Sequence, residues 1–299
     1  MSTDTTTDST TLSICAVCGK EGDSDNMNTC NKCKSVKYCN AACKKKHRTK
    51  HKKACERRVA ELHEEQLFKD LPSPEECPIC LLPMPTTDQT FQSCCGKLIC
   101  DGCIYAMLKS EGGKDLCAFC RTPPPRSDDD IVKRLKKLMD KGDGEAFNTL
   151  GLAFQRGEYG LAQDHQKANE LYLKAGELGC SSAYYNLGNS YRLGRGVERV
   201  MKKAGYYFEL AAMMGSVMAR HNLGGNEYEA GNLQKAMKHC MIAAKAGEED
   251  SLNIVKKGFM AGLVTKDEYA DTLRSHHERQ NEMRSDEREE AEEAAKNRR

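Results

Sequence analysis

The 299-residue sequence predicts a multidomain fold class: two small metal-stapled fingers with little regular structure, followed by an all-α solenoid of helix pairs. Two observations carry this prediction. Fifteen of the 17 cysteines lie in the first 120 residues, many of them in pairs separated by two residues. Beyond residue 130, alanine, leucine and glycine recur with a period of 36 or 37 residues, which is typical of stacked helical repeats.

The first cysteine cluster supplies seven thiols and one imidazole, enough for two tetrahedral zinc sites. Its Cys-x2-Cys loops let both sulfurs approach one metal, and its last two ligands, four residues apart, share one face of a short helix. Disulfides are the alternative, but residues 1–13 are polar and lack the apolar core of a secretion signal, which favours zinc. The candidate ligands are Cys15, Cys18, Cys30, Cys33, Cys39, Cys43, His51 and Cys55.

The order and spacing of these ligands over residues 15–55 resemble those of the MYND zinc finger. The resemblance implies a cross-brace, in which the two sites interleave along the chain. It implies one zinc ion at Cys15, Cys18, Cys39 and Cys43, and a second at Cys30, Cys33, His51 and Cys55. His47, one helical turn before His51, is interpreted as a surface or outer-shell residue.

A basic stretch lies within this finger, with seven Lys or Arg residues between positions 44 and 53. We interpret it as a solvated helix face, and a nuclear import signal or nucleic-acid patch is the alternative. The formal net charge of the whole chain is only +2, so no global field attracts it to nucleic acid, and nucleic acid is not an expected partner.

The second cluster contributes eight more thiols, again enough for two zinc ions. Over residues 77–121 it resembles a RING finger, although Lys97 occupies the usual histidine position and an ammonium group cannot coordinate zinc. The resemblance implies an all-cysteine version with one zinc at Cys77, Cys80, Cys100 and Cys103, and another at Cys94, Cys95, Cys117 and Cys120. If Cys94 only packs, the second site would have three protein ligands and an open position.

A RING finger, by resemblance, holds a ubiquitin-conjugating enzyme (E2) and its ubiquitin conjugate without providing a nucleophile. The candidate E2 contacts are Ile79, Met107, Ala118 and Arg121. Met107 and Ala118 stand where many active RINGs have tryptophan and proline. A ubiquitin ligase and a zinc-stapled protein-binding platform are therefore both open interpretations of this module.

The second half of the chain repeats a helix pair, with Ala146, Ala183 and Ala219 each four residues before a leucine and five before a glycine. The later positions of the third copy follow at 32 residues. The units resemble Sel1-like repeats, relatives of the tetratricopeptide repeat. Their aromatic residues are interpreted as core. Polar residues that recur on the first helices are the candidate peptide contacts: Asn186, Asn189, Arg192, Asn222 and Asn226.

These modules predict a zinc-binding adaptor with four Zn²⁺ per chain, two per finger, whose partners are proteins or peptides. A RING-type ligase that recruits an E2 enzyme, and a nuclear transcription-regulatory adaptor that uses the MYND finger, are the alternatives. No catalytic motif and no membrane span is apparent, and a cytoplasmic or nuclear location is expected. The predicted segments are a disordered N-terminus (1–14), the first finger (15–55), a helical linker (56–76), the second finger (77–121), a linker (122–130), the solenoid (131–264) and a charged C-terminal helix with a solvated, frayed end (265–299).

Overall fold

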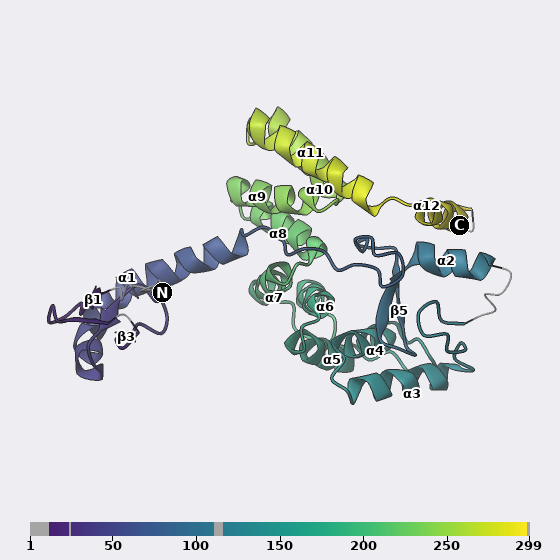
Figure 1. The fold of residues 1–299 in the computed structure, drawn as a ribbon, viewed down its shortest axis with the longest axis horizontal. Coiled ribbons are helices and arrows are strands. Elements are labelled where there is room, and N and C mark those ends of the chain that lie inside the picture. Colours follow the sequence, from purple (N-terminus) through teal and green to yellow (C-terminus); the bar gives the residue numbers. More distant parts are fainter. Residues whose placement is uncertain (1–11, 24, 111–115, 298–299) are drawn as a thin grey trace, which may run out of the picture. The chain divides into compact units, whose positions relative to one another are not determined.

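The computed structural model describes residues 12–23, 25–110 and 116–297 (Figure 1). The chain divides into two compact units, residues 1–69 and residues 70–299. The second finger belongs to the same unit as the helical repeats, which the sequence did not indicate. Most of the predicted disordered N-terminus, residues 1–11, lies outside the described residues, whereas residues 12–14 form a strand.

The first unit contains two short hairpins and one long helix. Strands β1 (Leu12–Ile14) and β2 (Glu21–Asp23) pair antiparallel, as do β3 (Asn28–Thr29) and β4 (Lys37–Tyr38). Helix α1 (Ala41–Leu67) begins where the Asn40 side chain accepts a hydrogen bond from the Cys43 amide. At 27 residues, α1 is much longer than the short helix expected for the finger.

The linker expected to be helical over residues 56–76 is helical only as far as Leu67. The following residues, 70–75, have no regular structure. Pro72 and Pro74 explain why this stretch is not helical, because proline disfavours helical geometry in the residue before it and removes a backbone donor.

In the second unit, the second finger is built on one hairpin and one helix. Strands β5 (Gln89–Gln92) and β6 (Lys97–Cys100) pair antiparallel, and helix α2 (Asp101–Lys109) follows directly. Phe91 of β5 packs against the hydrophobic core at the start of the solenoid. This contact is one of those that join the finger to the helical repeats.

The solenoid stacks antiparallel helix pairs, and each helix packs on the next along the chain. Most of its helices are 13 residues long, and several start at a side-chain cap, such as Asp143, Asp164 and Ser216. The helices are α3 (Asp128–Met139), α4 (Gly144–Arg156), α5 (His165–Glu177), α6 (Ser181–Leu193), α7 (Met201–Met213), α8 (Val217–Glu229), α9 (Leu233–Lys245) and α10 (Glu249–Met260).

The recurring glycines lie where the two helices of a repeat approach most closely. A methyl group on Gly151 or Gly188 would lie 2.7 Å from the Tyr172 ring or 2.6 Å from the Phe208 ring, respectively. At the equivalent position of the third repeat, a methyl group on Gly224 would lie 2.6 Å from the Cys240 sulfur. The period seen in the sequence is therefore a packing requirement, since no larger residue fits at these positions without displacing the ring or the thiol.

Two helices follow the repeats, α11 (Lys266–Met283) and α12 (Asp286–Lys296). Helix α11 packs on α9 and α10, and the buried His276 shares a 2.8 Å hydrogen bond with the Ala244 carbonyl. The chain then bends at residues 284–285, and α12 packs on α2 of the second finger (Figure 1). Residues 286–296 are therefore helical and not frayed, but α12 has no buried residue, which is consistent with a largely solvated segment; residues 298–299 lie outside the described part of the chain.

Candidate metal centres and binding surfaces

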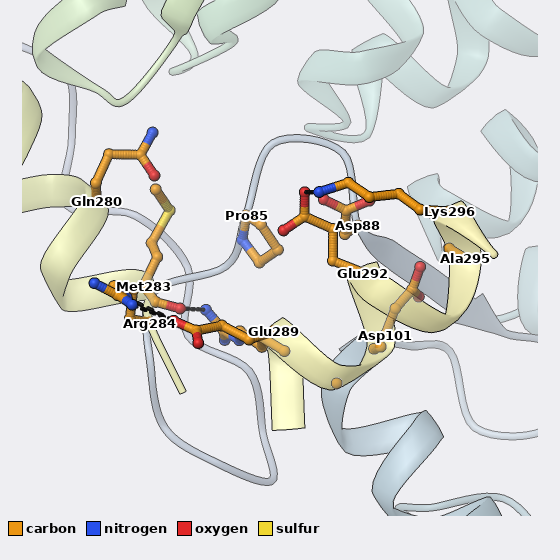
Figure 2. Close-up of a pocket in the computed structure, with 13 residues that line it drawn as sticks. Pro85, Asp88, Asp101, Gln280, Met283, Arg284, Glu289, Glu292, Ala295 and Lys296 are labelled. Atoms are coloured by element: carbon orange, nitrogen blue, oxygen red, sulfur yellow. Dashed lines mark hydrogen bonds and ion pairs between the residues drawn. The ribbon is translucent and has the colours of Figure 1, made fainter. Parts of the chain in front are cut away.

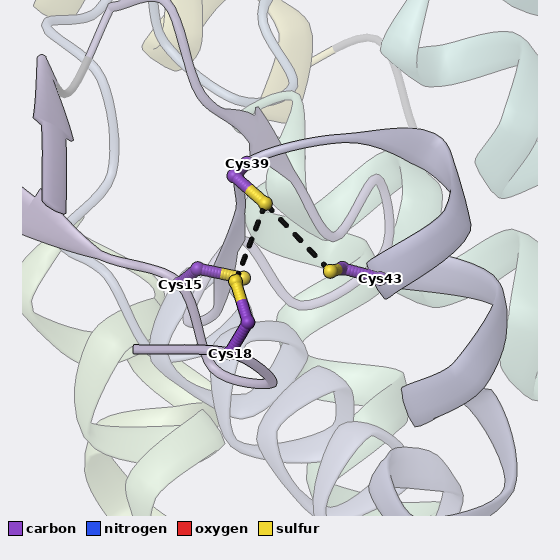
Figure 3. Close-up of side chains that lie close together, drawn as sticks. All are labelled: Cys15, Cys18, Cys39 and Cys43. Carbon is purple, nitrogen blue, oxygen red and sulfur yellow. Dashed lines mark hydrogen bonds between the residues drawn. The ribbon is translucent and has the colours of Figure 1, made fainter. Parts of the chain in front are cut away.

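The structure brings the sixteen candidate ligands together in four groups of four. Within each group, the sulfur and nitrogen donor atoms lie within 4.8 Å of one another. Figure 3 shows the first group, with the Cys39 sulfur in contact with those of Cys18 and Cys43. The groups are Cys15, Cys18, Cys39 and Cys43; Cys30, Cys33, His51 and Cys55; Cys77, Cys80, Cys100 and Cys103; and Cys94, Cys95, Cys117 and Cys120.

The distances within the groups fit zinc. Zn–S bonds of about 2.3 Å in a tetrahedron place sulfur atoms about 3.8 Å apart. The observed separation is 3.6 Å for Cys30 and Cys55, and 3.8 Å for Cys80 and Cys100. In the second group, the Cys33 sulfur lies 3.3 Å from His51 Nε2. The four Cys/His groups are consistent with four zinc ions.

Cys94 and Cys95 both lie in the fourth group, although they are adjacent in the chain. Cys94 lies 3.4 Å from the Cys120 sulfur, and Cys95 lies 3.9 Å from that of Cys117. Gly96 makes this possible because its left-handed backbone, with φ of +71°, closes the turn after both thiols. The geometry favours four protein ligands over a site with an open position.

Backbone amides and neighbouring thiols shift the pKa values of the cysteines of the first group in opposite directions. Hydrogen bonds from the backbone of Cys18 and Cys39 lower the pKa of Cys15 to about 6. Hydrogen bonding with the Cys18 thiol raises the pKa of Cys39 to about 12. Thiolates packed this closely repel each other, so the full set of charged ligands requires a divalent cation among them.

Four Cys-x2-Cys knuckles share one backbone geometry. In each, the residue after the second cysteine donates its amide to the carbonyl of the first cysteine, at 2.9–3.1 Å. That residue has positive φ in every case, and only one of the four is a glycine. The residues are Gly19, Lys34, Leu81 and Arg121, with φ of 72°, 56°, 59° and 60°.

His47 lies beside the second metal group and is not one of its members. Its ring stacks on His51 with centroids 5.5 Å apart, and its Nδ1 is 3.2 Å from the Tyr38 hydroxyl. Both contacts orient the face of α1 that carries His51 and Cys55, which is the outer-shell position expected for His47.

The four candidate E2 contacts lie on the second finger, and the structure places two of them in contact. The guanidinium of Arg121 is 3.8 Å from the Met107 sulfur. Ile79 is 40% exposed on the first knuckle, and Ala118 is partly buried on the last one. Sequence reasoning missed Leu81 and Phe119, apolar knuckle residues that are 67% and 45% exposed; their place beside the ligands was the available signal.

The candidate peptide contacts of the solenoid separate into two groups. Arg192, Asn222 and Asn226 line one cavity of about 190 Å³ between α6 and α8. Asn189 lies outside that lining and accepts a 3.0 Å hydrogen bond from Arg192. Asn186 donates to Asn148 of the preceding repeat at 2.9 Å, so its amide is used in the stacking of repeats.

The basic stretch of α1 forms one wall of a cavity of about 750 Å³ in the first finger. Lys44 is partly committed to the fold, since its ammonium donates to the Thr29 carbonyl and to Asn31, both at 2.9 Å. Among the lining residues, five are basic and one, Glu56, is acidic. The basic lining residues are Lys32, Lys44, Lys45, Arg48 and Lys52.

Comparison with known families agrees with the resemblance of the first finger and with that of the helical repeats. Residues 15–55 match the MYND finger, and residues 149–180 and 181–216 match the Sel1 repeat. Neither match includes the second cysteine cluster. The chain therefore has an N-terminal cysteine-rich zinc-finger region with small sheets, which includes a MYND finger, followed by a helical Sel1-like solenoid.

No curated protein matches the chain. Among solved structures, a Sel1 repeat protein from Oxalobacter formigenes is 25% identical with a TM-score of 0.43, over 50% of this chain and 63% of that one. The protective antigen c5321 of uropathogenic Escherichia coli, which displays an SLR fold, is 20% identical with a TM-score of 0.43. That match covers 51% of this chain and 34% of the antigen. The match thus spans less than two thirds of either solved chain. None of the described helices is long and apolar enough to cross a membrane.

Proposed function

We propose that this chain is a protein-interaction adaptor whose zinc ions are structural. The observation that carries the proposal is that each metal group offers four protein donors within 4.8 Å of one another. A zinc ion with four protein ligands has no position left for water or substrate, which is the arrangement of structural rather than catalytic sites. The MYND finger and the Sel1 repeats, both protein-binding modules, then provide the surfaces for partners.

The cavity beside α1 favours an acidic partner segment. Its five basic side chains face one carboxylate, and Lys45, Arg48 and Lys52 are exposed at its edge. Opposite charge accelerates association and selects the partner, although each exposed pair contributes little affinity. The buried Tyr38, also in the lining, adds an aromatic surface beside the basic side chains, whereas Cys30, His51 and Cys55 of the lining belong to the second metal group.

This assignment is tested by measuring, by fluorescence anisotropy, the binding to the intact protein of an acidic peptide and of a neutral peptide in which glutamine and asparagine replace the glutamate and aspartate residues. The variant Lys45→Glu/Arg48→Glu should weaken binding of the acidic peptide by about tenfold or more. The control Lys46→Glu/Lys53→Glu reverses the same number of charges on α1 outside the cavity lining and should bind like the unaltered protein. Equal weakening in both variants would show that net charge, and not this cavity, attracts the peptide.

A second candidate function is ubiquitin ligation through residues 77–121. It is favoured by the Arg121–Met107 contact and by the exposure of Ile79 in the neighbouring knuckle. In this reading the finger binds an E2 enzyme through an apolar surface, and the solenoid selects the substrate. The finger itself supplies no nucleophile, because its thiols are occupied as metal ligands.

The test is ubiquitin chain formation by the intact protein with a panel of E2 enzymes, with zinc content measured on each sample. Ile79→Ala should abolish transfer while four zinc ions are retained. Leu173→Ala is the matched control, since Leu173 is also 40% exposed but lies on α5 of the solenoid. No transfer with any enzyme at four zinc ions per chain would reject the ligase function and leave the adaptor.

A further inference from the structure

The C-terminal helix α12 and the second finger are in tight contact. Gly102 of α2 faces Arg288, and a methyl group on Gly102 would lie 2.6–2.9 Å from Arg288 atoms, two of them in the backbone. Only glycine allows the two helices to approach this closely. A cavity of about 360 Å³ lies beside this contact. Figure 2 shows residues that line it, among them Asp101 of α2 and Glu292 and Lys296 of α12.

Arg288 connects three parts of the chain through its guanidinium group. Its Nη1 donates to the carbonyl oxygens of Pro83, in the finger, at 2.9 Å and of Met283, at the end of α11, at 2.8 Å. Its Nη2 donates to the sulfur of Cys80 at 3.4 Å. Cys80 belongs to the metal group that Cys77, Cys100 and Cys103 complete.

This hydrogen bond has a definite chemical role. A zinc-bound thiolate keeps negative charge on sulfur, and a cationic donor in the outer shell disperses that charge and fixes the orientation of the ligand. Arginine can hold the sulfur and two carbonyls at once because its donors are arranged in a planar fork. Lysine, a point charge on a flexible stem, cannot reproduce that arrangement.

The contact leaves the candidate E2 surface open. Gly102 and Lys109, which pairs with Glu290 of α12 at 2.7 Å, are seven residues apart and share one face of α2. Met107 lies about 140° around the helix from Gly102. Helix α12 therefore contacts the opposite side of α2 from Met107, and it supports the finger without covering the Met107–Arg121 surface.

We propose that α12 is a structural part of the second finger and that Arg288 is a positioning residue for the zinc site of Cys77, Cys80, Cys100 and Cys103. The second finger is then attached to the helical part of the chain at two places. Phe91 packs against the hydrophobic core at the start of the solenoid, and α2 packs against α12, which follows the solenoid. Because binding equilibria are reciprocal, zinc at this site stabilises the docked helix as much as the docked helix stabilises zinc. The proposal concerns metal retention and stands whether or not the finger acts as a ligase.

The test is zinc retention in the intact protein, read separately for each finger. The protein is titrated with a chelator, freed thiols are alkylated, and peptides are quantified after trypsin digestion. The peptide Leu98–Lys109 reports on Cys100 and Cys103, and the peptide Tyr38–Lys44 reports on Cys39 and Cys43 of the first finger. Amide exchange of residues 286–296 with and without zinc measures the reciprocal effect.

Arg288→Gln should lower zinc affinity at this site by about 10- to 100-fold, the usual cost of losing an outer-shell partner, and leave the Tyr38–Lys44 peptide protected as before. Gly102→Ala should do the same with Arg288 in place, because the added methyl group displaces α12. The controls are Arg274→Gln, an exposed arginine of α11, and Gly205→Ala, with open space around it. Unchanged protection of Leu98–Lys109 in Arg288→Gln, or parallel loss in both fingers, would overturn the proposal.

Discussion

Replacement of Gly188 by alanine tests the repeat packing directly. The added methyl carbon would lie 2.6 Å from Cδ1 and Cε1 of Phe208, about 1 Å inside the optimal contact distance between carbon atoms. Phe208 is fully buried, so its ring cannot turn out to solvent. Such overpacking costs about 1–3 kcal/mol. The higher helix propensity of alanine offsets about 0.5–1 kcal/mol of this cost, so the free energy of unfolding should fall by roughly 1 kcal/mol, and by no more than about 2.5 kcal/mol.

The assay is urea unfolding followed by far-ultraviolet circular dichroism. Gly205→Ala is the matched control, since Gly205 lies in the next helix, α7, with nothing within 4 Å of the added carbon. It should gain about 0.5–1 kcal/mol. Adding Phe208→Ala to Gly188→Ala should cost less than Phe208→Ala costs alone, because the ring that clashes is gone. A Gly188→Ala protein as stable as Gly205→Ala would refute the packing argument.

Two further predictions concern charge and backbone strain. Burial raises the pKa of Glu248, but hydrogen bonds from His221 and Ser251 outweigh it and lower that pKa to about 2, while the bond to Glu248 raises the pKa of His221. The pair therefore stabilises the solenoid most between about pH 4.5 and 6.5. Stability relative to His221→Gln should fall as pH rises through the raised pKa of His221, and a pH-independent difference in urea midpoints would contradict this. Leu81→Gly should relieve about 1 kcal/mol of strain from the left-handed backbone and raise the thermal midpoint of the zinc-loaded protein. Gly19→Leu should introduce that strain and lower the thermal midpoint. Equal midpoints would show that the knuckles tolerate either residue.

The metal groups were predictable from the sequence because coordination is largely local. A Cys-x2-Cys knuckle places two sulfurs on one ion whatever surrounds it, so Cys15 and Cys18 had to share a site. The repeats were predictable for a similar reason. Gly151 and Gly188 each meet the ring of the next helix, and that close approach imposes the same residue in each copy.

The docking of α12 and the length of α1 were not predictable from local pattern. Both segments are densely charged and lack an apolar stripe, which is why residues 278–299 suggested a solvated end. Helix α12 is held on the second finger by the contact of Gly102 with Arg288. These residues are 186 positions apart in the sequence, and no periodic pattern connects residues at that separation. The cavity beside the basic residues of α1 was likewise not predictable from the sequence, because Lys32 and Tyr38, which precede α1 in the chain, complete its lining in the fold.

The central claim is that the two fingers are built on four zinc ions, each saturated by protein ligands. Native mass spectrometry of the intact protein tests it most directly, with Cys120→Ser as the ligand variant and Cys180→Ser, a buried thiol of the solenoid, as the control. We expect four zinc ions in the unaltered protein and in Cys180→Ser, and fewer in Cys120→Ser. Fewer than four in the unaltered protein, or an unchanged count in Cys120→Ser, would contradict the account.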